Sequence, residues 1–184
     1  MCEGNQKMLD VSSQEKSPYI LVVDDDDDDV FLIRNALKRI GWGAGAKIQC
    51  GRVDNGVDAV SLLSRKDAGV DLPAAVILDI NMPKLDGIGV LRALRHAPGL
   101  RELPIFVLTT TANETAHVTA MDLGATRIFV KPNTMTELTR IVREILDAVD
   151  ALASTHAAPR APGASSRSPG ASPRSPEASQ IANF

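Results

Sequence analysis

Cysteine and histidine are both scarce in this chain of 184 residues. The two cysteines, Cys2 and Cys50, lie in a polar leader and in a predicted strand, so they support neither a disulfide framework nor a thiolate metal site. The three histidines, His96, His117 and His156, have no spacing typical of metal ligands. We therefore expect reduced thiols, as in a cytosol, and structural or solvent-facing roles for the histidines.

Long apolar runs and a strong charge imbalance are also absent. No stretch approaches the roughly 20 apolar residues that cross a membrane, and residues 1–18 lack the apolar centre of a secretory signal. A net charge of -3 does not suggest a surface that coats nucleic acid, and an apolar content of 44% excludes disorder throughout the chain. We expect a compact cytoplasmic protein with no membrane or nucleic-acid partner.

The composition divides the chain into three parts. From Ala153 onward it changes to Ala, Pro, Ser, Gly and Arg, with no spaced apolar set before Ile181 and Phe184, so residues 153–184 are predicted to be a disordered tail. Residues 1–17 are predicted to be a flexible leader. The length suits one domain rather than two, and we place it at residues 18–152.

Within this domain, short apolar runs alternate with longer segments of helical period. That pattern is typical of βα units on a parallel sheet, an α/β fold with five strands and five helices. Most of the runs are continuously apolar, as expected for strands covered on both faces. The five predicted strands cover residues 19–23, 47–53, 74–78, 105–108 and 127–130.

Two of the predicted helices have clear apolar stripes. The first stripe ends at a glycine-rich turn and consists of Val30, Ile33, Leu37 and Ile40. The last helix follows a capping box formed by Thr134 and Glu137. Its stripe consists of Leu138, Ile141, Val142, Ile145, Leu146, Val149 and Leu152.

Aspartates follow two of the predicted strands. Residues 20–33 read ILVVDDDDDDVFLI, and the last four of these aspartates suit the first turn of a helix. Asp24 and Asp25 instead lie at the carboxyl tip of the first strand, and Asp79 ends the third in the same way. In open α/β sheets this edge is where ligands bind, so we expect the three acids to converge there.

A hydroxyl and an ammonium group are expected at the same edge, because Thr109 ends the fourth apolar run and Lys131 ends the fifth. Clustered carboxylates are best stabilised by a hard divalent cation such as Mg2+. A metal and a lysine together can offset the charge of a phosphoryl group while a remaining acid acts as nucleophile. The set therefore predicts phosphoryl transfer.

Four motifs carry a resemblance to a known family: the acid pair, LDINMPKLDG at residues 78–87, PIFVLTT at 104–110 and VKP at 130–132. With these motifs, residues 19–152 resemble the receiver domain of two-component response regulators. The resemblance implies a flavodoxin-like, doubly wound sheet of order 2-1-3-4-5, with the ligand site where strands one and three end.

The resemblance also implies a role for each acid. Asp79 would be the phosphoacceptor, Asp25 a direct Mg2+ ligand, and Asp24 a ligand bound directly or through water. The backbone carbonyl of Asn81 would complete the protein ligands. The protein would then receive a phosphoryl group rather than act as an enzyme on other molecules, catalysing its own phosphotransfer and slow dephosphorylation.

Lys131 and Thr109 would act after these acids. Lys131 would pair with Asp79 and then with the phosphoryl group. A cis peptide bond between Lys131 and Pro132, typical in the family, would direct the lysine side chain into the site. Thr109 would swing its hydroxyl onto that group.

The positions that tune hydrolysis in the family hold Asn81 and Thr111. Thr111 could equally cap the next helix together with Glu114.

One position departs from the family pattern, because Ile128 stands where an aromatic switch residue is usual, with Phe129 beside it. We expect the signal to rely instead on the helix near residues 113–123 and on the fifth strand and helix moving together. Since no foldable pattern follows the domain, output is expected through protein contacts.

The segments DVFLIRNAL and TTTANE resemble most the stand-alone regulators that serve phytochrome-type sensor kinases. The resemblance implies a sensor histidine kinase as the partner, of the bacteriophytochrome kind. It also implies a homodimer through the fourth helix, the fifth strand and the fifth helix.

Two alternatives stay open. In a phosphatase of the haloacid-dehalogenase type, Asp24 would be the nucleophile and Asp26 the general acid, although the usual threonine of that motif is missing and no acidic pair follows an apolar strand after Lys131. In a receiver-fold binding module, no phosphorylation would occur, although the complete set of acids, threonine and lysine argues against this.

Overall fold

The computed structural model describes residues 18–41, 47–66, 72–110 and 113–156. They form one sheet of five parallel strands in the order β2-β1-β3-β4-β5, which confirms the predicted topology. All five predicted strands are present, with ends that differ by at most two residues. The strands are β1 (Tyr19–Val23), β2 (Gln49–Val53), β3 (Ala75–Leu78), β4 (Ile105–Thr109) and β5 (Arg127–Val130).

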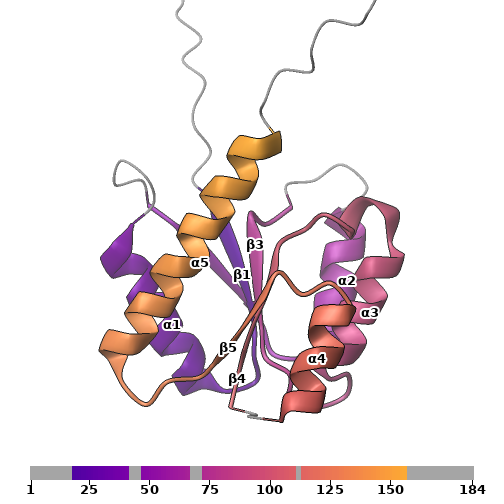
Figure 1. The fold of residues 1–184 in the computed structure, drawn as a ribbon, viewed down its shortest axis with the longest axis horizontal. Helices are drawn as coiled ribbons and strands as arrows, with labels where there is room; N and C mark the ends of the chain where they lie inside the picture. The colour runs from indigo at the N-terminus through magenta and orange to yellow at the C-terminus, as the bar shows by residue number, and fades with distance from the viewer. Residues whose placement is uncertain (1–17, 42–46, 67–71, 111–112, 157–184) are drawn as a thin grey trace, which may run out of the picture.

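The helices cover both faces of this sheet. Helices α1 and α5 lie on one face, and α2, α3 and α4 lie on the other (Figure 1). No helix within the described ranges is long and apolar enough to cross a membrane. The helices are α1 (Asp27–Ile40), α2 (Gly56–Lys66), α3 (Gly87–His96), the short 3-10 helix η1 (Pro98–Leu100), α4 (Glu114–Asp122) and α5 (Met135–His156).

Helix α5 runs four residues beyond Leu152, the predicted end of the domain. The predicted leader, and the predicted tail from residue 157, lie outside the described residues. The predicted stripe of α5 is confirmed, since its members from Leu138 to Val149 are buried and Leu152 is partly buried.

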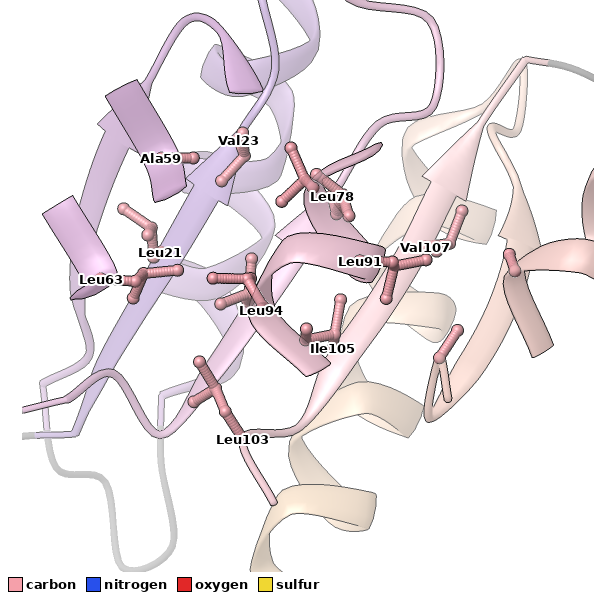
Figure 2. Packing of buried hydrophobic residues seen from close by; sticks show 14 of the residues in the cluster. Leu21, Val23, Ala59, Leu63, Leu78, Leu91, Leu94, Leu103, Ile105 and Val107 are labelled. Atoms are coloured by element: carbon pink, nitrogen blue, oxygen red, sulfur yellow. The ribbon is translucent and has the colours of Figure 1, made fainter. Parts of the chain in front are cut away.

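Each face of the sheet has its own core, because successive side chains of a strand point to opposite faces. Ile20 and Val22 pack with α1 and α5, whereas Leu21 and Val23 pack with α2 and α3. Figure 2 shows the second of these clusters, with Leu21, Val23 and Leu78 between the helices and the sheet. Burial on both faces explains the continuous apolar runs in the sequence.

Side-chain caps fix where the helices begin. Asp26 Oδ1 accepts hydrogen bonds from the backbone N–H groups of Asp28, at 2.8 Å, and Asp29, at 3.2 Å, so the acidic run starts α1 as predicted. At α5, Thr134 Oγ1 accepts from the N–H of Glu137 at 3.3 Å. At α4 the cap is Asn113, so the capping box proposed for Thr111 is wrong, and Thr111 itself lies outside the described residues.

Candidate functional site

Three carboxylates meet at the carboxyl edge of the sheet. Strands β1 and β3 are neighbours with Val23 opposite Leu78, so the next residues, Asp24 and Asp79, emerge side by side. The N–H of Asp79 also donates to the carbonyl of Val23 at 2.9 Å. Oxygen atoms of Asp24, Asp25 and Asp79, one from each, all lie within 4.8 Å of one another. The predicted convergence of these acids is confirmed.

Two of the three acids are buried and held by the backbone. Asp24 is 2% exposed and Asp79 is 5% exposed, whereas Asp25 is exposed to solvent. One oxygen of each buried acid accepts a backbone hydrogen bond: Asp79 Oδ1 from Ile80 at 2.8 Å, and Asp24 Oδ1 from Asp26 at 3.0 Å. These bonds fix the orientation of both carboxylates.

Lys131 reaches the remaining oxygens of these two acids. Its Nζ lies 2.8 Å from Asp24 Oδ2 and 3.5 Å from Asp79 Oδ2, and it is 2.7 Å from Asp29 Oδ2. The predicted pairing with Asp79 is therefore present but is the longest of the three contacts. Lys131 forms shorter bonds to two other acids, one of which, Asp29, had been assigned only to the start of a helix.

The bond from Lys131 to Pro132 is trans, since the described residues contain no cis peptide bond, so the expected cis bond is wrong. Lys131 enters the site because β5 pairs with β4 up to Thr109 and Val130. The N–H of Lys131 then donates to the carbonyl of Thr109 at 2.8 Å. Strand pairing alone thus brings the lysine to the edge.

The charges at this edge favour a cation. Burial raises the pKa of Asp24, and the neighbouring Asp79 adds to this effect, although the hydrogen bond from Lys131 opposes it. Burial lowers the pKa of Lys131, but its bonds to Asp24 and Asp29 outweigh burial and raise the pKa above its usual range. Lys131 is thus charged at neutral pH, but it shares its charge with Asp29, so negative charge remains in excess.

This donor set suits Mg2+. Oxygen atoms alone, several of them carboxylate, are what this small hard cation prefers, and it readily keeps waters as its other ligands. The exposed side of Asp25 leaves room for such waters. Asp24, Asp25 and Asp79 are the residues that fit the ion.

Arg52 of β2 supports the loop that carries the acid pair. Its Nη2 donates to the carbonyl of Asp25 at 3.1 Å and its Nε to that of Asp24 at 3.4 Å, while Nη1 pairs with the Asp27 carboxylate. Arg52 belongs to no motif in the sequence and was not among the predicted site residues. Its only signal is the strand order, which places the end of β2 beside the end of β1.

The loop after β3 explains the Asp-Gly pair that ends the LDINMPKLDG motif. Asp86 caps α3 by accepting from the N–H of Gly89 at 2.7 Å, and the N–H of Gly87 donates to the carbonyl of Ile80 at 2.9 Å. A Cβ on Gly87 would lie 2.3 Å from the carbonyl oxygen of Asp79. Glycine is therefore required for α3 to start against the backbone of Asp79.

The sequence profile of the response regulator receiver domain matches residues 20–143. This chain belongs to that family. The receiver domains of two-component response regulators accept a phosphoryl group on an aspartate. Among curated relatives, the probable transcriptional regulator ycf27 of Porphyridium aerugineum is 35% identical over 107 residues. That match covers 58% of this chain and 41% of the relative, so the chain spans about two fifths of the length of ycf27.

Solved structures agree with this assignment. The phosphorylated cyanobacterial phytochrome response regulator RcpA is 29% identical, with a TM-score of 0.63 over 70% of this chain and 91% of RcpA. The Mn2+-bound response regulator Rcp1 is 27% identical, with a TM-score of 0.61 over 70% of this chain and 91% of Rcp1. The predicted resemblance to phytochrome-associated regulators is confirmed.

Thr109 and Ile128, the positions that the family resemblance marks as switch residues, lie on β4 and β5. Thr109 is fully buried at the end of β4, and Asn81 lies exposed in the loop after β3. Ile128 packs against the core shared with α2, α3 and α4, whereas Phe129 packs against the core shared with α1 and α5. Because the two side chains face opposite sides of the sheet, Phe129 does not replace the aromatic residue that is missing at Ile128.

The phosphatase alternative is not supported. Asp26, its proposed general acid, accepts two backbone hydrogen bonds at the start of α1, and these bonds lower the pKa of its carboxyl group. A group held in its charged form is a poor proton donor. This observation agrees with the family assignment.

Proposed function

We propose that this receiver domain accepts a phosphoryl group from a sensor histidine kinase onto Asp79, with Mg2+ held by Asp24, Asp25, Asp79 and the backbone carbonyl of Asn81. The observation that carries the proposal is the cluster of three carboxylates within 4.8 Å, with the charged Lys131 beside it. The Mn2+ named for the related Rcp1 adds support for a divalent cation.

In the proposed reaction, a carboxylate oxygen of Asp79 attacks phosphorus, a new P–O bond forms, and the P–N bond to the kinase histidine breaks. The imidazole leaves with the electron pair of that bond, and Asp79 becomes an acyl phosphate. Bound Mg2+ would supply charge compensation for the phosphoryl oxygens. Lys131 would pair with one of these oxygens, and Thr109 would donate its hydroxyl to another.

The protein would catalyse only its own phosphorylation and the slow hydrolysis of the product. We further propose that the kinase is of the phytochrome type, because the similar RcpA is a phytochrome response regulator. Since the kinase makes its phosphohistidine from ATP, the exchange would take place in the cytoplasm. Output would come through protein contacts.

The direct test uses a small phosphodonor. The full-length protein is incubated with acetyl phosphate and Mg2+, and its intact mass is followed. We expect one phosphoryl group per chain, lost again over time in the absence of donor. Unchanged mass at high donor concentration would contradict phosphoacceptance and favour the receiver-fold binding module.

We also propose that two copies associate through α4, β5 and α5. Three apolar side chains of α4 and β5 are exposed: Val118 and Met121 of α4 are 55% and 49% exposed, and Val130 of β5 is 48% exposed. Val118 and Met121 lie three residues apart on one face of α4, and exposed apolar groups that lie together mark protein contacts.

Met121→Glu would place a charge in this interface. We expect it to weaken the dimer at least tenfold by sedimentation equilibrium, since a buried unpaired charge costs well over about 1.4 kcal/mol. Phe31→Glu on α1 is the matched control, because Phe31 is also an exposed apolar residue of a helix, at 63%, but lies outside the proposed surface. Equal dimerisation of both variants would contradict the interface.

A further inference from the structure

The closest partner of the Lys131 ammonium is an acid outside the carboxylate cluster. Asp29 Oδ2 lies 2.7 Å from Lys131 Nζ, against 2.8 Å for Asp24 and 3.5 Å for Asp79. Asp24 and Asp79 belong to the set that fits Mg2+, whereas Asp29 does not. Of the three partners of Lys131, only Asp29 would therefore remain free of the metal when Mg2+ is bound to the cluster.

The fold explains how Asp29 reaches this position. It is the third residue of α1, and side chains of a helix tilt toward its N-terminus, here toward the carboxyl edge of the sheet. Helices α1 and α5 pack side by side on one face (Figure 1), so the start of α1 lies next to the loop between β5 and α5 that carries Lys131.

Apolar side chains cover one side of this ion pair. Asp29 and Lys131 line a cavity of about 20 Å³ together with Ile33, Leu108 and Leu138. The Lys131 side chain is only 9% exposed. The Asp29 side chain is 32% exposed, but the burial of Lys131 restricts its ammonium group to the positions where it has partners.

We propose that Asp29 is a positioning residue: it holds the Lys131 ammonium beside Asp79 before phosphorylation, so that Lys131 can receive the incoming phosphoryl oxygen. An ammonium group has three N–H donors. Two point at Asp24 and Asp29, and the long contact to Asp79 leaves the third for a phosphoryl oxygen. This role rests on the proposed function of the site.

The first test observes Lys131 directly by the 15N-edited NMR signal of its ammonium group, assigned by its absence in Lys131→Met. We expect Asp29→Ala to broaden or shift this signal and Asp29→Asn, which keeps an acceptor oxygen of the same shape, to preserve most of it. Asp28→Ala is the matched control, since Asp28 is exposed in the same helical turn and should leave the signal unchanged. An unchanged signal in Asp29→Ala would overturn the proposal.

The second test measures the phosphorylation rate with acetyl phosphate and Mg2+. Asp29→Ala is expected to be about tenfold slower than the wild type, the value of one ordinary charge-assisted hydrogen bond, and Asp29→Asn less than about threefold slower. Asp28→Ala should match the wild type. A wild-type rate in Asp29→Ala, or an equal loss in Asp29→Asn, would overturn the positioning role.

The two tests separate this inference from the proposed function. If the wild type itself takes up no phosphoryl group, the proposed function fails, and the ammonium signal alone decides whether Asp29 positions Lys131. If the wild type is phosphorylated and only Asp29→Ala is slow with an altered signal, both proposals stand. Because Asp29→Asn keeps the shape of the side chain, it also controls for a folding defect in Asp29→Ala.

Discussion

Replacing Asp79 with asparagine is expected to remove the phosphoryl adduct altogether. The amide has nearly the shape of the carboxylate and its oxygen can still accept the hydrogen bond from Ile80, so the loop should keep its conformation. A neutral amide is a very poor nucleophile, however, and forms no acyl phosphate. Intact mass after incubation with acetyl phosphate and Mg2+ measures the loss.

Two variants act as controls for this result. Asp28→Asn, in the exposed first turn of α1, should be phosphorylated like the wild type. Asp24→Asn keeps the acceptor and should give an adduct more slowly, because it loses one of the acids that fit Mg2+. A stable adduct in Asp79→Asn would reject the assignment. Continuous turnover of phosphate esters that stops only in Asp24→Asn would instead support the phosphatase alternative.

Removing divalent cations is expected to slow phosphorylation by roughly a hundredfold or more, since metal charge compensation contributes several kcal/mol in such sites. The reason is the charge at the edge of the sheet. Asp24, Asp25 and Asp79 would face an anionic donor with Lys131 as the nearby cation, and Lys131 shares its charge with Asp29. A phosphorylation time course in a chelator, followed by addition of Mg2+, measures the effect and its reversal.

Mg2+ binding itself can be measured by calorimetry without any phosphodonor. Asp25→Asn should weaken binding clearly, because an exposed carboxylate of the cluster is lost while the buried pair remains. Asp28→Asn should bind Mg2+ like the wild type. In the chelator experiment above, a phosphorylation rate that is the same with chelator and with Mg2+ would contradict the metal assignment. This conclusion would hold whatever the outcome of the Asp79 experiment.

The sequence predicted the sheet well, because each strand is an apolar run and burial on both faces demands such runs. Asp24, Asp25 and Asp79 could be placed together for the same reason, since each directly follows a run and parallel strands end at one edge. Lys131 was found by the same rule at the end of β5. The position of a residue relative to a strand end was sufficient for all four.

The partners of Lys131 and the support from Arg52 could not be predicted in this way. Asp29 lies 102 residues from Lys131, and its place in the first turn of a helix already accounts for its charge. Arg52 acts on backbone carbonyls, which leave no mark in the sequence. At α4, both Thr111 and Asn113 are residue types that cap helices, and only the path of the chain decides between them.

The two cores of this protein are separated by the sheet, and Asp24 and Asp79 lie at its carboxyl edge, where β1 and β3 end. The inward side chains of α2 and α3 pack against the face of the sheet that holds Leu21 and Val23. Those of α1 and α5 pack against the face that holds Ile20 and Val22. Within the described ranges, the buried side chains of the two faces therefore form two separate clusters. During evolution, the two outer surfaces can diverge separately to fit different proteins, while the acidic edge between them stays under one common chemical constraint.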